Sequence, residues 1–375
     1  MEYEKNRTYL EVHLSTLQEN YRQIRHLLSP HTDLMAVVKA DAYGLGAVAV
    51  TKALLACGCR QFATATLEEA MELRQAGIQA PLFVLGPVST FQVPLAVANQ
   101  LTLSVSSYAM AKTYQQALPA ASQPLLVQIA ADVGMSRFGL PLETAMEQSV
   151  KEACQIFTLP SLRVCGLYTH MTVMAHPTER EFDYHQLHLF ETFTQAVFAK
   201  GYHVPRHCAC SGMTLLYPES HMDLVRISAL LFGLQDPLYQ SFQTKEVCSL
   251  RSRIVFLKDV PRGTTVGYGP HVTRRATRLA VIPVGFGDGL HRSLSHQAPV
   301  LLHGKRTKVF GKLCMDFSMI DVTDIPQASL GDTVTLFGQD GDAFISVFEY
   351  AALYGGTACE VATSLGKRIN RIYLS

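Results

Sequence analysis

The stretch AVVKADAYGLG, from Ala36 to Gly46, decides how the rest of the chain is interpreted. The apolar run from Met35 to Val38 predicts a buried strand, and a glycine-punctuated, turn-like segment follows it. Lys39 lies at the end of that strand, where burial of an ammonium costs several kcal/mol unless the group is paired or neutral. A partly neutral lysine amine can form a Schiff base with a carbonyl. This window alone favours the alternative, a lysine that extends into water.

Composition bounds the class of protein. The 375 residues favour two domains, and a hydrophobic content of 48% suffices for a large core. Lys and Arg number 32 and Asp and Glu 31, so the net charge of +1 favours neither nucleic acid nor an anionic membrane. We expect no secretory signal in MEYEKNRTYLEV and no membrane span. The nine scattered cysteines do not resemble a disulfide framework, so we expect a cytoplasmic protein.

Short apolar runs alternate with helical patterns over the first part of the chain. Eight runs are predicted as strands: 35–40, 61–66, 81–85, 101–105, 125–131, 164–169, 206–210 and 223–227. Helical spacing occurs at 14–28, 48–57, 67–77, 107–117, 142–153 and 179–200. This alternation predicts an α/β fold, a (β/α)8 barrel of the TIM type. An open doubly wound sheet is the alternative, but no GxGxxG turn follows the first strand.

The pattern changes near Leu234. From Ser249 onward the apolar runs are shorter and glycines fall between them, which predicts an all-β domain. The runs are 253–259, 279–284, 300–302, 307–309, 318–322 and 333–337. We therefore divide the chain into a barrel at 1–240 and a β domain at 241–375. A short strand predicted at 8–13 is a candidate member of the β domain.

Five polar residues fall at the ends of predicted strands. Lys39 ends the first strand, Arg137 follows the fifth, His170 ends the sixth, Ser211 the seventh and Arg226 the eighth. Active sites of βα barrels lie at the carboxyl ends of the strands, so these side chains would share one mouth. Each alone has an ordinary explanation, such as a solvated arginine or a histidine bonded within the core. Their coincidence favours a functional site.

Eight motifs resemble the alanine racemase family. They are AVVKADAYGLG, DVGMSRFG (132–139), YTHM (168–171), DLVRISALLFGL (223–234), VGYG (266–269), PVGFGDG (283–289), CMDFSMIDVT (314–323) and RINRIY (368–373). They follow one another in order along almost the whole chain. The resemblance implies a homodimer of two-domain chains that uses pyridoxal 5′-phosphate to interconvert L- and D-alanine. It also implies a role in supplying D-alanine for a bacterial cell wall.

The resemblance implies two opposed bases. Lys39 would hold the cofactor as a Schiff base and would exchange a proton with one face of the substrate Cα. Tyr268 of the other subunit would exchange a proton with the opposite face. A tyrosine with an ordinary pKa of about 10 needs nearby cations to favour its phenolate, and His170 is a candidate. The alternative for Tyr268 is an ordinary aromatic residue of a β-turn.

The remaining site residues follow from the same motifs. Arg226 would donate a hydrogen bond to the pyridine nitrogen of the cofactor. Because arginine stays protonated, that nitrogen would stay unprotonated, and the cofactor ring would be a weaker electron sink. Arg137 would bind the substrate carboxylate. The cofactor phosphate would contact the residues matched as Tyr43, Ser211 and Ser228. Met315 would enter the substrate pocket from the other subunit, whereas Asp316 beside it is expected to be structural.

The chain departs from the family pattern around the expected site. The departures are Ala130 for a lysine, Val133 for a threonine, Cys210 for an asparagine, Ile227-Ser228 for Pro-Gly, and Phe286 and Cys359 for tyrosines. They leave Lys39 and Tyr268 unchanged, and they affect residues expected to anchor the cofactor or to line the entrance of the active site. They therefore suggest weaker cofactor retention, or a wider or less polar entrance.

Several alternatives stay open. One is a racemase for another or broader set of amino acids, such as serine. Another is a non-catalytic homologue that binds pyridoxal phosphate, for which a second base at Tyr268 has no use. A decarboxylase or aldolase would share Lys39, but no residue favours it. The spacing of His203, His207, Cys208 and Cys210 could suggest a metal, but alternating strand residues face opposite sides, so we expect no metal site.

Overall fold

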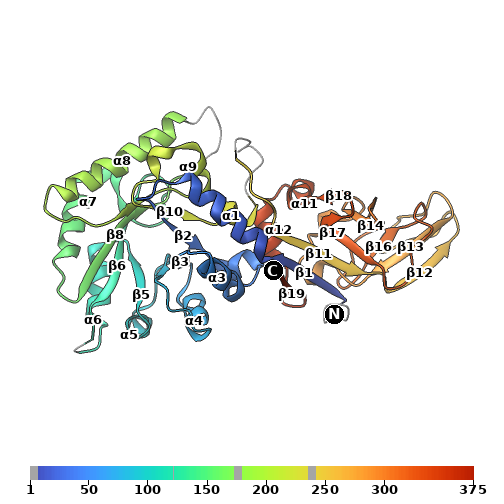
Figure 1. Cartoon of the computed structure of the whole chain (residues 1–375), viewed down its shortest axis with the longest axis horizontal. Helices are drawn as coiled ribbons and strands as arrows, with labels where there is room; N and C mark the ends of the chain where they lie inside the picture. The colour runs from blue at the N-terminus through green and yellow to red at the C-terminus, as the bar shows by residue number, and fades with distance from the viewer. Residues whose placement is uncertain (1–6, 121, 173–179, 235–241) are drawn as a thin grey trace.

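The structure is a computed structural model that describes residues 7–120, 122–172, 180–234 and 242–375. It has an elongated shape, with a βα barrel at one end and a β-rich domain at the other (Figure 1). Within the described residues there is no helix long and apolar enough to cross a membrane.

Eight parallel strands form the barrel, in the order β10-β2-β3-β4-β5-β6-β8-β9. They are β2 (Asp33–Val37), β3 (Gln61–Thr64), β4 (Leu82–Val84), β5 (Leu101–Val105), β6 (Leu125–Asp132), β8 (Leu162–Thr169), β9 (Arg206–His207) and β10 (Leu224–Ile227), and the short β7 (Leu140–Pro141) pairs with β6. Hydrogen bonds from Asp223 N–H to Arg206 O (3.3 Å) and from Arg226 N–H to Ala209 O (2.9 Å) join the two end strands. The predicted (β/α)8 architecture is confirmed, with the barrel nearly closed.

The six predicted helices are present, with ends shifted by a few residues. They are α1 (Leu14–Leu27), α3 (Ala47–Ala56), α4 (Leu67–Gln75), α6 (Tyr108–Gln116), α7 (Leu142–Phe157) and α8 (Arg180–Phe198). Three short helices were missed because one or two turns carry too little periodicity to detect: α5 (Val93–Ala98), α9 (Ser211–Leu216) and α10 (Ala229–Phe232). The first predicted strand was too long, because β2 ends at Val37 and Lys39 begins α2 (Lys39–Gly44).

The second domain contains a seven-stranded and a three-stranded sheet. Its strands are β11 (Cys248–Arg253), β12 (Phe256–Val260), β13 (Thr277–Ile282), β14 (Pro299–Leu302), β15 (Lys305–Lys308), β16 (Ser318–Asp321), β17 (Thr333–Asp340), β18 (Ala343–Ile345) and β19 (Asn370–Leu374). β1 (Thr8–His13) lies between β11 and β19 in the larger sheet, so the first described strand joins this domain. The boundary predicted after residue 240 stays a prediction, because residues 235–241 lie outside the described ranges.

The second domain is rich in β-strands, as predicted, and it also contains two helices that were not predicted, α11 (Val347–Tyr354) and α12 (Ala358–Ser364). Both helices begin at a side-chain cap. Ser346 accepts a hydrogen bond from the Glu349 N–H, and Thr357 and Glu360 form a capping box. These caps are visible in the sequence and could have located both helices.

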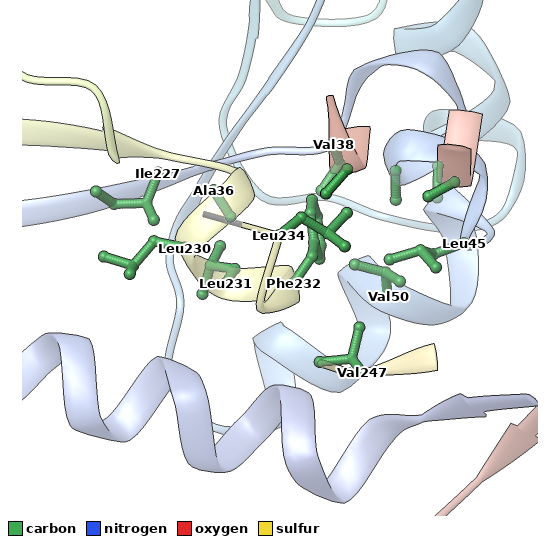
Figure 2. Close-up of a cluster of buried hydrophobic side chains, with 14 of the residues drawn as sticks. Ala36, Val38, Leu45, Val50, Ile227, Leu230, Leu231, Phe232, Leu234 and Val247 are labelled. Carbon is green, nitrogen blue, oxygen red and sulfur yellow. The ribbon is translucent and has the colours of Figure 1, made fainter. Parts of the chain in front are cut away.

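A buried apolar cluster supports the strand that leads to Lys39 (Figure 2). Ala36 and Val38 at the end of β2 lie near the segment after β10, which supplies Leu230, Leu231 and Phe232. All five side chains are fully shielded from solvent. Burial of each large side chain stabilises the fold by roughly 1.5–3 kcal/mol, so β2 and β10 are held firmly at this end of the barrel.

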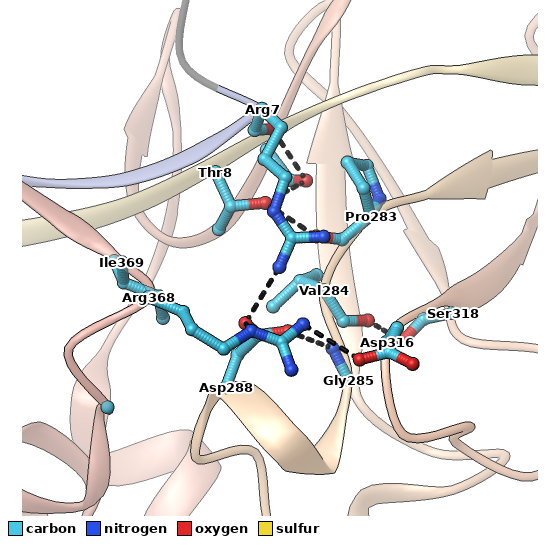
Figure 3. A network of polar contacts seen from close by, with 12 residues as sticks. Arg7, Thr8, Pro283, Val284, Gly285, Asp288, Asp316, Ser318, Arg368 and Ile369 are labelled. Carbon is cyan, nitrogen blue, oxygen red and sulfur yellow. Dashed lines mark hydrogen bonds and ion pairs between the residues drawn. The ribbon is translucent and has the colours of Figure 1, made fainter.

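The buried carboxylate of Asp288 joins residues from the two ends of the chain within the β domain (Figure 3). It accepts a hydrogen bond from the Gly285 N–H (2.9 Å) and pairs with Arg7 (3.0 Å) and Arg368 (3.1 Å). Arg368 also pairs with Asp316 (2.8 Å). Burial of a charge is tolerated when it is paired and hydrogen-bonded in this way. The contact agrees with the structural role expected for Asp316.

Glu246 lies where the chain enters the β domain, and both carboxylate oxygens accept a hydrogen bond from the Val347 N–H at 3.1 Å. Burial raises the pKa of Glu246 to about 7, although the bond from Val347 opposes this shift. The folded chain therefore binds more protons than the unfolded chain between about pH 4.5 and 7. It follows that the contribution of Glu246 to stability falls as the pH rises through this interval.

We predict that Glu246→Gln raises the melting temperature at pH 8 by roughly 2–4 °C and leaves it unchanged at pH 4.5. Glutamine keeps an acceptor for Val347 but carries no charge to bury. Thermal unfolding of parent and variant at both pH values checks this. Glu19→Gln, at a half-exposed carboxylate paired with Lys245 (3.3 Å), is the control. An equal shift at both pH values would contradict the prediction.

Candidate active site

A cavity of about 220 Å³ lies at the carboxyl ends of the barrel strands. Six of the predicted site residues line it: Lys39, Tyr43, Arg137, His170, Arg226 and Ser228. Its other walls are mainly apolar and come from Val37, Ala65, Leu85, Phe138 and Tyr168, with Gly86 and Cys210. Four of the five polar strand-end residues recognised in the sequence therefore converge on the cavity, as the barrel topology requires, and Ser211 does not line it.

Lys39 begins a left-handed turn. The four residues Ala40 to Tyr43 all have φ between 51° and 58° and ψ between 37° and 50°. For residues other than glycine this conformation costs roughly 1–2 kcal/mol each. Contacts elsewhere in the fold must therefore hold the turn in place.

Side chains from three elements hold this turn. Glu69, near the start of α4, accepts a hydrogen bond from the Ala40 N–H (2.7 Å), and Asp41 accepts one from the Ala47 N–H (2.6 Å). Arg371 of β19 donates to Gly44 O (2.9 Å). The Arg371 guanidinium also donates to the carbonyls of Leu365, Gly366 and Ile369 at 2.6–2.7 Å. The C-terminal strand of the β domain is thereby bonded to the backbone beside Lys39.

Two glycines let the β domain approach the turn closely. A Cβ on Gly44 would lie 2.4 Å from Ala362 O in α12, and one on Gly46 would lie 1.8 Å from the Tyr373 hydroxyl. Both glycines also have positive φ, which other residues adopt at a cost. Glycine at these positions therefore allows the two domains to pack around Lys39.

Arg226 is the buried cation of the site. It donates to Thr169 O (2.7 Å) and to His207 Nδ1 (2.6 Å). Because arginine only donates, His207 Nδ1 is an acceptor and its neutral ring carries the proton on Nε2, which donates to Gln128 Oε1 (2.6 Å). Burial and the charge of Arg226 hold the pKa of His207 well below its usual value. The network thus keeps Arg226 as a fixed positive charge.

One nitrogen of Arg226 remains available. None of the described residues accepts a hydrogen bond from its Nε, although the other guanidinium nitrogens are bonded. Arg226 lines the cavity despite being only 4% exposed. Its free N–H can therefore bond a ligand atom inside the cavity.

His170 lies beside Arg226, with 3.4 Å between the Arg226 Nη2 and the His170 Nδ1. Burial, followed by the charges of Arg226, Arg137 and Lys39, lowers the pKa of His170 to about 3. The side chain is therefore neutral at physiological pH. The proposed cationic role for His170 does not fit this environment, because three neighbouring cations already disfavour its charge.

Tyr43 and Ser228 bring two hydroxyl groups to the wall of the cavity, and Ser211 supports Ser228. Ser211 begins α9, and its Oγ accepts hydrogen bonds from the N–H groups of Ser228 (3.1 Å) and Leu230 (3.4 Å). Burial raises the pKa of Tyr43 to about 12, against a hydrogen bond with Ser228 that lowers it, so the phenol stays protonated. These groups donate hydrogen bonds without carrying a negative charge, which suits an anion.

Arg137 occupies the loop after β6. The Asp132 carboxylate accepts from the N–H groups of Gly134 (2.9 Å) and Ser136 (3.1 Å) and shapes this loop. The Arg137 guanidinium lies 4.9 Å from the centre of the Phe138 ring, and no carboxylate in the described part of the chain pairs with it. Ala130, where the family carries a lysine, is buried in an apolar cluster inside the barrel.

Three predicted site residues do not line this cavity. Ser211 bonds the backbone of Ser228 beside it, and the other two lie further away. Tyr268 and Met315 belong to the β domain, where their side chains are 64% and 55% exposed. Neither lines the cavity that contains Lys39. A single chain therefore does not bring them to the barrel mouth.

Sequence reasoning missed the residues that support the site. His207 was considered only as a metal ligand, yet it bonds Arg226, and the part of the chain that the structure covers has no group of three or more side chains suited to a metal. Alternation along the strand could have placed His207 inside the barrel. The capping box of Thr66 and Glu69 could have been recognised, but not the bond from Glu69 to the lysine turn. Nothing in the sequence indicates the contact of Arg371.

Comparison with known proteins identifies the family. A family model described as alanine racemase, N-terminal domain, matches residues 12–236, and one described as alanine racemase, C-terminal domain, matches residues 247–373. An alanine racemase of Methanococcus maripaludis is 34% identical over 371 residues, which cover 98% of each chain. One of Carboxydothermus hydrogenoformans is also 34% identical, over 98% of this chain and 99% of that relative.

Solved structures agree with these relatives. Alanine racemase from a D-cycloserine-producing Streptomyces lavendulae superposes with a TM-score of 0.91 at 31% identity, over 99% of this chain and 97% of that one. Alanine racemase of Bartonella henselae with covalently bound pyridoxal phosphate gives 0.86 at 26% identity, over 98% and 99%. The two family models together span nearly the whole chain. The chain therefore belongs to the alanine racemase family.

Proposed function

We propose that this chain is a pyridoxal-phosphate-dependent isomerase that interconverts L- and D-alanine with two opposed bases, Lys39 and Tyr268. The observation that carries the proposal is the convergence of Lys39, Arg137 and Arg226 on one cavity. It is supported by full-length similarity to relatives named alanine racemase.

The cavity suits pyridoxal phosphate on two grounds. The free Nε–H of Arg226 can bond the pyridine nitrogen, and the hydroxyls of Tyr43 and Ser228 can bind the phosphate, with Ser211 holding the backbone of Ser228. Ser228 stands where the family has glycine; its N–H already donates to Ser211 Oγ (3.1 Å), and its hydroxyl would offer the phosphate a hydrogen bond. Lys39 would hold the cofactor covalently. When bound, the cofactor withdraws electrons from the substrate Cα and so makes its hydrogen acidic.

The residues of the chain then have distinct tasks. Arg137 binds the substrate carboxylate through charge-assisted hydrogen bonds, and this fixes the orientation of the Cα–H bond. The Lys39 amine removes or returns the proton on one face of Cα, and the Tyr268 phenol does so on the other. Arg226 keeps its proton throughout, because a guanidinium does not deprotonate in a protein.

We further propose that the active site is shared by two copies of the chain in a homodimer. Tyr268 and Met315 belong to a group of exposed apolar side chains on the β domain that includes Val272 (49%) and Phe317 (45%). Exposed apolar groups of this kind mark interaction surfaces. A symmetric dimer would bury them against the barrel mouth of the second copy. The cytoplasmic location expected from the sequence stays a prediction.

A broader substrate range is the second candidate function. Arg137 has no carboxylate partner in the described residues, and Ala130 is much smaller than the lysine of the family. Phe286 and Cys359 replace two phenols, and burial raises the pKa of Cys359 to about 11, so this thiol stays neutral. These replacements remove the charged end of the family's lysine and two phenol hydroxyls, and so would reduce the polarity around the site.

We predict that the parent protein incorporates solvent deuterium at Cα of both alanine enantiomers. Lys39→Ala should abolish racemisation, and Tyr268→Phe should slow it by about 10²–10⁴-fold, the usual contribution of a general base. Proton NMR and chiral chromatography measure exchange and racemisation. Tyr354→Phe, at a half-buried tyrosine stacked on His291, is the control. Parental rates in Tyr268→Phe would exclude a second base, and no exchange in the parent would favour a non-catalytic homologue.

We predict measurable racemisation of L-serine as well as L-alanine, with kcat/KM for serine within about 100-fold of that for alanine, because a pocket discriminates weakly against one added hydroxyl. Cofactor should also dissociate during gel filtration and restore activity when added back. Chiral analysis with titrated pyridoxal phosphate checks both outcomes. Strict preference for alanine together with full retention of the cofactor would contradict the proposal of a less polar entrance with weaker cofactor binding.

A further inference from the structure

Tyr268 lies at the tip of a β-hairpin that spans residues 263–273. Hydrogen bonds from Gly263 N–H to Thr273 O (2.8 Å) and from Val266 N–H to His271 O (2.8 Å) join its two sides. The Tyr268 side chain is 64% exposed and has no hydrogen-bond partner within the described residues. Its direction therefore depends on where the hairpin backbone is held.

His271 connects the hairpin to the rest of the β domain. Its ring packs on that of His296, with 3.8 Å between the ring centres and 60° between the planes. His296 lies in the segment before β14 and has a left-handed φ of 65°. The Gly311 N–H donates to His296 Nδ1 (3.2 Å), and the His296 N–H donates to Gly311 O (3.1 Å). The His296 ring is thus fixed to the backbone at Gly311.

The same backbone also supports the other side of the hairpin. A Cβ on Gly311 would lie 2.7 Å from Val266 O, so only glycine permits this approach. A Cβ on Gly267 would lie 3.2 Å from Lys312 O. The hairpin is therefore held at Val266 on one side of Tyr268 and at His271 on the other.

The histidine pair carries a cost that an apolar pair would avoid. Because the Gly311 N–H donates to Nδ1, the neutral His296 ring carries its proton on Nε2. Nε2 of both histidines is buried and lacks a partner in the part of the chain that is described. An unpaired buried polar group destabilises a fold, so stability alone does not explain the pair. Burial, then His271, Lys312 and Lys308, lower the pKa of His296 and keep it neutral.

We propose that the contact between His271 and His296 positions the Tyr268 base; this inference rests on the proposed function. Both histidines are positioning residues, because they act on the hairpin and do not line the cavity of Lys39. A loosened contact would displace one base and leave the other in place. The two proton transfers of the racemase should therefore respond differently.

The test uses the purified holoenzyme with His271→Ala, His296→Ala and the double variant. We expect kcat/KM for alanine to fall about 10- to 100-fold in both directions, as for a base displaced by about 1 Å. The α-deuterium isotope effect should rise for the enantiomer whose α-hydrogen faces Tyr268 and should not rise for the other. The double variant should be no worse than the worse single variant, because the two rings act as one unit.

Two further variants separate positioning from general damage. His296→Asn keeps an acceptor for the Gly311 N–H and tolerates the left-handed backbone, so it removes the ring contact with little loss of folding. It should reproduce the isotope effect of His296→Ala. The control is His303→Ala, on the same domain, where the imidazole pairs with Asp332 (2.7 Å). It should keep parental kinetics.

Three results would overturn the inference. One is parental kcat/KM and isotope effects in the folded His271 and His296 variants while Tyr268→Phe is impaired, which leaves the proposed function intact. A second is an equal rise of the isotope effect for both enantiomers, which indicates general damage. The third is parental racemisation by Tyr268→Phe, which removes the proposed function and this inference together.

Discussion

The hydrogen bonds that hold the left-handed turn after Lys39 are the constraint on which the site depends. Four consecutive residues other than glycine adopt a conformation that costs roughly 1–2 kcal/mol each. Glu69 of the barrel bonds the beginning of the turn, and Arg371 of the β domain bonds its end. The lysine is thus placed by both domains. This explains why the β domain packs so closely on the barrel mouth at Gly44 and Gly46.

Electrostatics in the cavity follow from the same arrangement. Lys39, Arg137 and Arg226 bring three cationic side chains to one small space, and the nearby histidines His170 and His207 are neutral because burial and these cations lower their pKa values. Such a site favours anionic ligands. The neutral histidines orient Arg226 and add no further positive charge.

The sequence was sufficient to predict the barrel because each strand is a short apolar run and the helical spacing between runs is regular. It was also sufficient to place Lys39, Arg137, His170 and Arg226 at strand ends. The left-handed turn from Ala40 to Tyr43 could not be predicted. Alanine and tyrosine do not favour this conformation, and side chains distant in the sequence hold it in place. The neutral state of His170 was missed for a similar reason, since its charge depends on neighbours brought together only by folding.

In the proposed dimer, each active site combines Lys39 of one subunit with Tyr268 of the other. Heterodimers of a Lys39→Ala chain and a Tyr268→Phe chain, carrying two different affinity tags and purified on both, test it directly. Each heterodimer would contain one site with both bases and one with neither. We expect about half of the parental racemase activity per dimer, far above either homodimeric variant. Activity no higher than that of the two homodimers would contradict a shared site.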